Sequence, residues 1–140
     1  MSYLISVIVC TCNRPDLLKT ALKTLSEQET GGQFDYEVIV VDNTAAGVMK
    51  PAFDQVSPLF NGRARYFIEA QRGKSFALNH GLKQAKGNII AFTDDDITAE
   101  PLWLQKVHNA LNRHDCDGIG GRVLPVYPDE TPQWIKDNAV

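Results

Sequence analysis

Residues 89–98 read IIAFTDDDIT, an apolar run that ends in three consecutive aspartates. The apolar part is typical of a buried strand. Three adjacent carboxylates repel one another and are costly to bury, so packing alone does not account for them. On an extended backbone alternate side chains share a side, which places Asp94 and Asp96 together and Asp95 opposite. The stretch therefore predicts a buried strand that delivers a pair of carboxylates to its end.

Apolar, β-branched runs alternate with helix-like segments along the whole chain. Strands are expected at residues 4–10, 36–42, 64–68, 88–93 and 118–126, and helices at 15–25, 49–57, 75–86 and 101–111. Residues at helical spacing mark apolar faces in two helices: Leu17, Leu18, Ala21, Leu22 and Leu25 in the first, and Leu78, Leu82 and Ala85 in the third. Gly87 is expected to end the third helix, and residues 127–140 are expected to be loop. This order predicts an α/β fold with a mainly parallel sheet and helices on both faces.

Polar residues follow three of the expected strands at the point where each strand ends. Cys10-Thr11-Cys12-Asn13 closes the first strand, Asp42-Asn43 the second, and Asp94-Asp95-Asp96 the fourth. Parallel α/β sheets bind their ligands beyond the carboxyl ends of the strands. These groups are therefore expected to converge on one ligand site at one edge of the sheet.

The composition is that of one ordinary globular domain. The chain has 140 residues, 44% of them hydrophobic and 22% charged, with a formal net charge of −3. That balance indicates no general attraction to nucleic acid or to an anionic membrane. No apolar stretch approaches the roughly 20 residues that span a bilayer, and no basic segment precedes the first apolar run. We expect a cytoplasmic domain without a nucleic-acid partner or a transmembrane segment, with peripheral attachment at the inner membrane face as an alternative.

Cysteine usage favours reduced thiols. Cys10, Cys12 and Cys116 cannot all pair with one another, and a small disulfide scaffold would use more cysteines. No zinc-like spacing relates these cysteines to the three histidines, which are His80, His108 and His114.

Three interpretations compete for the aspartates. In the first, Asp94 and Asp96 grip a divalent metal and its diphosphate, because Mg²⁺ commonly takes one or two carboxylates plus substrate phosphates. In the second, they form a solvated acidic turn that caps the following helix. In the third, Asp94-x-Asp96-x-Thr98 is the nucleophile motif of haloacid-dehalogenase-like phosphatases. The third is weak, because few residues follow Thr98 and they include no acidic pair suited to a metal.

Arg72-Gly73-Lys74-Ser75 ends like a phosphate-binding Gly-Lys-Ser loop. The earlier glycine of that motif falls on Ile68, so the loop is absent. A helix N-terminus flanked by Arg72 and Lys74 still attracts phosphate. An ordinary turn with two solvated basic residues explains the same stretch equally well.

The order of these motifs resembles the family 2 glycosyltransferases, which have the GT-A fold. The matching segments cover nearly the whole chain and read ISVIVCTCNRPDLLKTALKTLSEQ, YEVIVVDN, RGKSFALNHGLKQAKGNIIAFTDDDI and PLWLQKV. The resemblance implies a Rossmann-like GT-A domain, residues 1–140, that binds a nucleotide-diphosphate sugar, with a UDP-sugar as the expected donor. It also implies Mn²⁺ or Mg²⁺ as the cofactor and a saccharide or lipid-linked acceptor.

The resemblance assigns roles to individual residues as well. Contacts to the nucleotide sugar are expected from Thr11, Cys12, Asn13, Arg14, Asp42, Arg72, Gly73, Lys74, Ala77, Asn79, Asp94 and Asp95. Asp42 matches the aspartate that accepts a hydrogen bond from the base, commonly uracil. Leu78 replaces the family's frequent arginine, so phosphate contacts are expected to shift to Arg72 or Lys74. Asp96 is expected to hold the metal, which would neutralise charge on the departing diphosphate.

A catalytic base is not identifiable in this sequence. Family 2 enzymes are typically inverting, with an aspartate that activates the acceptor hydroxyl. That base normally lies downstream of the strand expected at 118–126, and an exposed turn is the better explanation for Asp129 and Glu130. We therefore expect a donor-binding part truncated before the acceptor region. The alternative is a non-catalytic nucleotide-binding or partner-docking module of the same fold.

Overall fold

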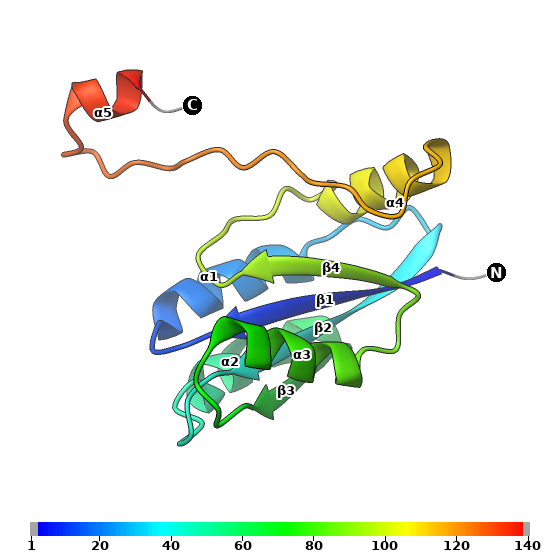
Figure 1. Cartoon of the computed structure of the whole chain (residues 1–140), viewed down its shortest axis with the longest axis horizontal. Helices are drawn as coiled ribbons and strands as arrows, with labels where there is room; N and C mark the ends of the chain where they lie inside the picture. Colours follow the sequence, from blue (N-terminus) through cyan, green and yellow to red (C-terminus); the bar gives the residue numbers. More distant parts are fainter. Residues whose placement is uncertain (1–2, 139–140) are drawn as a thin grey trace.

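The structure is a computed structural model that describes residues 3–138. Its centre is a four-stranded parallel sheet in the order β3-β2-β1-β4 (Figure 1). The strands are β1 (Tyr3–Thr11), β2 (Phe34–Asp42), β3 (Ala64–Ile68) and β4 (Ile89–Asp94). β1 pairs with β2 on one side and with β4 on the other, so that Thr11 lies beside Asp42 and Cys10 beside Asp94. The expected α/β fold with a parallel sheet is confirmed.

Helices cover both faces of the sheet (Figure 1). They are α1 (Pro15–Ser26), α2 (Lys50–Val56), α3 (Lys74–Gln84), α4 (Trp103–Arg113) and α5 (Gln133–Asp137), with a short 3-10 helix, η1 (Ser57–Phe60), after α2. Val7 and Val9 belong to a large core that takes in α1, α2, η1 and Leu104 of α4. Ile8, one residue between them, points to the other face and packs against Ala77 of α3. The period-2 alternation of one apolar strand thus supplies two cores.

Helix α1 begins where Pro15 occupies the first turn, a position that proline suits because its φ is already helical. Leu18, Leu22 and Leu25 are fully buried, and burial of one such side chain contributes about 1.5–3 kcal/mol. Leu17 is 45% exposed, so its expected place on the apolar face is wrong. It points away from the sheet because it lies outside the narrow stripe that meets the core.

Helix α3 packs on the sheet mainly through small side chains. Ala77 and Gly81 are buried, and a Cβ added to Gly81 would lie 2.6 Å from Cγ2 of Ile8. Leu78 and Ala85 pack against the core around Ile8 as expected and are partly buried, while Leu82 is 40% exposed, so its expected place on the apolar face is wrong. The helix also ends at Gln84 and not at Gly87.

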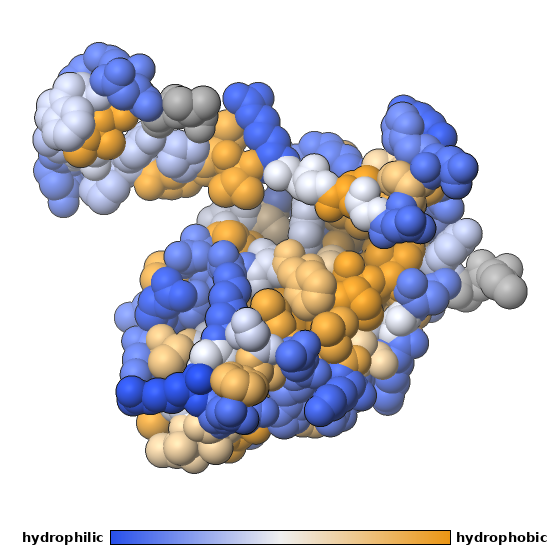
Figure 2. Space-filling model, viewed as in Figure 1, coloured by the Kyte–Doolittle hydropathy of each residue, from blue (hydrophilic) through white to orange (hydrophobic). Residues whose placement is uncertain are grey.

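The segment after α4 departs most from expectation. Residues 118–126 form no strand, and Val123 and Val126 are 81% and 90% exposed. Residues 118–126 form an extended arm that stands away from the body of the molecule, and Figure 2 shows apolar surface along it. The prediction of a strand was wrong because alternating apolar residues make a strand only when another strand pairs with them. Residues 133–137 form α5 where loop was expected, and α4 begins at Trp103 instead of residue 101.

Strand order places a crevice between β1 and β4. The connection through α1 leads from β1 to β2 over one face, and the connection through α3 leads from β3 to β4 over the other. The chain therefore leaves β1 in one direction and returns to its opposite side, which is the switch point where open α/β sheets bind ligands. No helix among residues 3–138 has both the length and the apolar character needed to cross a membrane.

Candidate functional site

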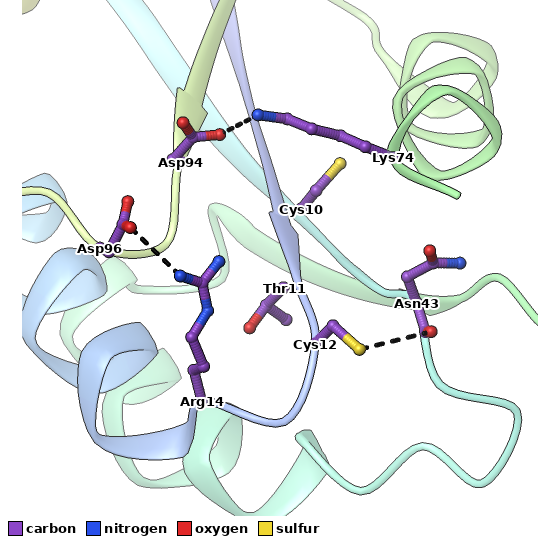
Figure 3. Close-up of a pocket in the computed structure, with 8 residues that line it drawn as sticks. All are labelled: Cys10, Thr11, Cys12, Arg14, Asn43, Lys74, Asp94 and Asp96. Carbon is purple, nitrogen blue, oxygen red and sulfur yellow. Dashed lines mark hydrogen bonds and ion pairs between the residues drawn. The ribbon is translucent and has the colours of Figure 1, made fainter. Parts of the chain in front are cut away.

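A pocket of about 240 Å³ opens at the carboxyl ends of β1, β2 and β4 (Figure 3). The residues that line it are Cys10, Thr11, Cys12, Arg14, Asn43, Lys74, Asp94 and Asp96. They come from the end of β1 and its following loop, from the residue after β2, from the first turn of α3 and from the end of β4. The expected convergence of strand-end polar groups is confirmed.

The three aspartates separate as strand alternation predicts. Asp94 and Asp96 line the pocket, with side chains 50% and 46% exposed. Each carboxylate meets a cation: Lys74 Nζ pairs with Asp94, and Arg14 Nη1 lies 3.1 Å from Asp96 Oδ2 (Figure 3). Two acids and two bases therefore face the same space.

Asp95 turns away from the pocket and is fully buried. Its Oδ2 accepts a hydrogen bond from Thr11 Oγ1 at 2.7 Å, and its Oδ1 lies 2.7 Å from Arg14 Nη2. Arg14 thus touches two of the three aspartates, one buried and one exposed. The expected contact between Asp95 and a nucleotide sugar stays a prediction, which this geometry does not favour.

Asp42 is also fully buried and lies outside the pocket lining. Its Oδ1 accepts hydrogen bonds from the backbone N–H and the hydroxyl of Thr44, at 3.0 and 2.7 Å. Its Oδ2 accepts from the backbone N–H of Met49 at 2.9 Å and from the Tyr66 hydroxyl at 2.5 Å. Burial, reinforced by Asp42, raises the pKa of Tyr66 and keeps its hydroxyl a donor. Recognition of the nucleotide base by Asp42 stays a prediction, although both of its carboxylate oxygens already accept hydrogen bonds from protein groups.

The strand end presents Asn43 to the pocket instead. Its Nδ2 donates to the carbonyls of Glu69 and Gln71 at 2.9 and 2.8 Å, and its Oδ1 accepts the Gly73 N–H at 2.9 Å. Sequence reasoning placed Asn43 at the converging strand ends but gave it no role. Its position directly after Asp42 was the available signal, because alternation sends one of two neighbouring side chains inward and the other outward.

Five further expected site residues do not line the pocket: Asn13, Arg72, Gly73, Ala77 and Asn79. Ala77 is buried between α3 and the sheet, and the other four are exposed. Asn13 and Gly73 have φ of 54° and 135°, conformations that asparagine tolerates and glycine adopts freely. These two residues shape the loops that carry Arg14 and Lys74. Cys10, which sequence reasoning did not name as a site residue, does line the pocket.

Two groups that line the pocket, Lys74 and Cys10, have raised pKa values. The hydrogen bond to Asp94 raises the pKa of Lys74, so its ammonium stays charged. Burial, with Asp94 and Asp95 nearby, raises the pKa of Cys10 to about 11. At neutral pH Cys10 is therefore a protonated thiol and not an anionic nucleophile.

A hard divalent cation fits this donor set. Asp94 and Asp96 offer exposed carboxylate oxygens on one side of the pocket, the ligand type that Mg²⁺ and Mn²⁺ prefer. Within residues 3–138 no group of three or more His, Cys, Asp or Glu side chains is placed to hold a metal. A cation here would need further oxygens from water and from a phosphorylated ligand, which is how Mg²⁺ is usually bound.

The chain belongs to glycosyl transferase family 2, whose sequence profile matches residues 6–139. It is 30% identical over 125 residues to glycosyltransferase AglE of Haloferax volcanii, an alignment that covers 89% of this chain and 41% of the relative. Identity to hyaluronan synthase of Pasteurella multocida is 34% over 121 residues, or 84% of this chain and 12% of that enzyme. The chain thus spans 41% or less of the length of these relatives.

Solved structures agree with this assignment. Mannosyltransferase PcManGT from Pyrobaculum calidifontis, in complex with GDP-Man and Mn²⁺, superimposes with a TM-score of 0.69 at 27% identity, over 79% of this chain and 33% of that chain. S. aureus TarS 1-349 in complex with UDP-GlcNAc shares the fold, with a TM-score of 0.67 at 24% identity, over 90% of this chain and 37% of that chain. The expected GT-A fold is confirmed.

Proposed function

We propose that this domain binds the nucleotide-diphosphate sugar used in an inverting glycosyl transfer, with a divalent metal held by Asp96. The observation that carries the proposal is the pocket at the switch point, where Asp94 and Asp96 face Arg14 and Lys74. A metal–diphosphate needs carboxylate oxygens for the cation and cations for the phosphates, and the pocket offers both. PcManGT, a relative with the same fold, holds GDP-Man and Mn²⁺.

Each pocket residue has a distinct task in this proposal. Asp96 would hold Mn²⁺ or Mg²⁺, and the bound cation supplies Lewis-acid neutralisation of the departing diphosphate. Arg14 and Lys74 offer N–H donors to phosphate oxygens, with the bidentate fork of arginine giving the more directional contact. Asp94 is assigned to the ribose or the donor sugar.

The acceptor side is not assigned to residues of this chain. Inverting transfer needs a base that accepts the proton of the acceptor hydroxyl. Only Asp94 and Asp96 among the pocket residues are acids, and both are committed to the donor. Asp129 and Glu130 are exposed and do not line the pocket. We therefore propose residues 1–140 as the donor-binding part and a saccharide or lipid-linked hydroxyl as the acceptor.

Calorimetric titration with UDP, GDP, dTDP and ADP, each with and without Mn²⁺, tests the donor site. We expect one diphosphate to bind in a Mn²⁺-dependent manner, and Asp96→Ala to remove that dependence while the unfolding temperature changes little. Asp16→Ala, at an exposed acid of α1 outside the pocket, is the matched control. Metal-dependent binding that survives in Asp96→Ala would refute the metal assignment.

The alternative function, a non-catalytic module of the same fold, differs from the proposed one in catalysing no reaction, so a binding measurement does not separate the two. Transfer from, or hydrolysis of, the matching sugar nucleotide by this chain would exclude it. Family membership gives no support to the phosphatase interpretation of Asp94 and Asp96.

A further inference from the structure

The middle aspartate has a place of its own in the structure. Asp95 is fully buried, and it lies on the side of the backbone away from the pocket. A buried carboxylate needs partners. Asp95 Oδ2 accepts a hydrogen bond from the Thr11 hydroxyl at 2.7 Å. Its Oδ1 makes no hydrogen bond within the described residues, and its salt bridge to Arg14 Nη2 at 2.7 Å is an ion pair without hydrogen-bond geometry. Both partners come from the end of β1 or its loop, so Asp95 joins the ends of β4 and β1 beneath the pocket floor.

Arg14 connects this buried carboxylate to the exposed one. While Nη2 meets Asp95, Nη1 lies 3.1 Å from Asp96 Oδ2, and the arginine side chain is 47% exposed. The backbone of Arg14 is held as well, because its carbonyl accepts the Leu18 N–H at 3.0 Å in the first turn of α1. One guanidinium therefore has one end anchored in the interior and the other end exposed at the pocket.

The two ends differ in how easily they can be released. An ion pair between exposed groups is screened by water and contributes little to stability. Removing the partner of a buried carboxylate costs far more, because the charge is then left unpaired in the interior. A ligand can therefore displace Asp96 from Arg14 at low cost, whereas the ion pair between Arg14 and Asp95 is expected to stay in place.

The local charge count explains why replacement should need two ligands. Three carboxylates meet two cations, Arg14 and Lys74. A metal alone has to take Asp96 from Arg14 and leaves that end of the guanidinium without an anion. A diphosphate supplied at the same time offers Arg14 Nη1 a new anionic partner, so the two ligands favour each other.

We infer that Asp95 is a positioning residue that anchors Arg14, and that Arg14 exchanges Asp96 for a phosphate oxygen when metal and diphosphate bind together. This inference rests on the proposed donor site and deepens it. It assigns a task to each aspartate: Asp96 to the metal, Asp94 to the donor, and Asp95 to the arginine that makes their binding cooperative.

The test measures Mn²⁺ affinity without and with a saturating diphosphate, either UDP or GDP, by calorimetry and by the electron paramagnetic resonance signal of free Mn²⁺. In the unaltered chain the diphosphate should tighten Mn²⁺ binding at least about fivefold. Arg14→Gln removes the competitor for Asp96, so Mn²⁺ alone should bind more tightly while the gain from diphosphate is lost. Asp95→Asn keeps the shape of the side chain and its contact with Thr11 but releases Arg14. The factor by which diphosphate tightens Mn²⁺ binding should therefore fall toward one.

Two controls separate exchange from general electrostatics. Lys74→Gln makes the same charge change in the same pocket but does not touch Asp96, so it should raise the affinity for Mn²⁺ alone less than Arg14→Gln does. Asp16→Asn repeats the acid-to-amide change on the exposed side of α1 and should alter nothing. Circular dichroism and thermal unfolding establish that each variant is folded. Asp95→Asn and Arg14→Gln both break the buried ion pair, so each is interpreted only where it is folded, and the coupling of Mn²⁺ and diphosphate in the unaltered chain tests the exchange without any variant.

The outcomes are distinct. Equal rises in Arg14→Gln and Lys74→Gln, or an unaltered chain in which Mn²⁺ and diphosphate bind independently, would overturn the exchange while leaving the donor site standing. Full coupling in a folded Asp95→Asn would overturn the anchoring role. Absence of any diphosphate binding, with or without Mn²⁺, would overturn the proposed function and this inference together.

Discussion

The side chain of Asn43 holds the backbone of Gly73, whose N–H donates to Asn43 Oδ1 at 2.9 Å. The amide Nδ2 of Asn43 donates to the carbonyls of Glu69 and Gln71 at 2.9 and 2.8 Å. One side chain at the end of β2 thus fastens the loop between β3 and α3 at three points. Lys74, which follows Gly73 and begins α3, reaches Asp94 from this loop.

Asn43→Ala should loosen that loop. It removes three hydrogen bonds in a partly exposed setting, which should lower the free energy of unfolding by about 1–3 kcal/mol. Amide hydrogen exchange at Gly73 should accelerate, and diphosphate affinity should fall because Lys74 is no longer held toward the pocket. Asn109→Ala, at an exposed asparagine of α4, is the control. Unchanged exchange at Gly73 would show that the loop does not depend on this amide.

Asp42→Ala should act first on stability. The change leaves the buried backbone N–H of Met49 and the Tyr66 hydroxyl without their acceptor, which should cost about 2–4 kcal/mol in urea unfolding. Base preference can be measured in the same variant by titration with the four diphosphates. A stable variant with altered base preference would restore the direct base contact expected for Asp42 and contradict the internal role.

The sheet could be predicted from the sequence because its two central strands, β1 and β2, are buried on both faces. Residues 7–10 and 38–41 are continuously apolar, which is typical of parallel strands under two layers of helix. Residues 118–126 carry a similar local pattern but remain unpaired, since local pattern does not supply a neighbouring strand. Helix α3 was predicted, but its closest contact with the sheet was not: the close approach to Ile8 selects Gly81, and glycine leaves no apolar signal in the sequence.

The orientation of site side chains could be predicted where it depends only on the alternation of neighbouring residues along one strand. Alternation correctly paired Asp94 with Asp96 and turned Asp95 inward. It was not applied to Asp42 and Asn43, where the resemblance to a family pointed to the aspartate and the structure presents the asparagine to the pocket. Contacts such as Arg14 with Asp95 join residues far apart in the chain, so no local pattern contains them.

Stability should fall in acid partly through Glu37. Burial alone would raise its pKa, but hydrogen bonds from Ser6, the Lys86 N–H and Arg65 outweigh burial and lower the pKa below 4.5. The unfolded chain therefore binds this proton more readily than the folded one. The contribution to stability is complete above the unfolded pKa and is lost as the pH falls through the lowered folded value.

Urea unfolding at pH 7, 5 and 3.5 measures this effect. Between pH 5 and 3.5 the unaltered chain should lose more stability than Glu37→Gln, which has no proton to take up there. Glu100→Gln, at an exposed acid paired with Lys106, should follow the unaltered chain. Parallel pH curves for Glu37→Gln and the unaltered chain would contradict the role of Glu37.

Two of the three cysteines, Cys10 and Cys12, line the pocket, so their reactivity can be used to detect a bound ligand. Cys10 has a pKa of about 11, so roughly one thiol in a thousand is ionised at pH 8. Cys12 is exposed on the pocket lining, and Cys116 is exposed outside it. Because the thiolate is the reactive form, iodoacetamide at pH 8 should label Cys12 and Cys116 well before Cys10.

Protection of Cys12 from labelling by a bound ligand tests whether the ligand occupies the pocket. A diphosphate bound with Mn²⁺ in the pocket should slow labelling of Cys12 and leave Cys116 unchanged, as followed by mass spectrometry of tryptic peptides. Cys116 serves as the control within the same molecule, since its distance from the pocket lining leaves its reactivity independent of the ligand. If a nucleotide that binds by calorimetry leaves Cys12 as reactive as before, it binds outside this pocket, because Cys12 lines the pocket together with Arg14 and Lys74.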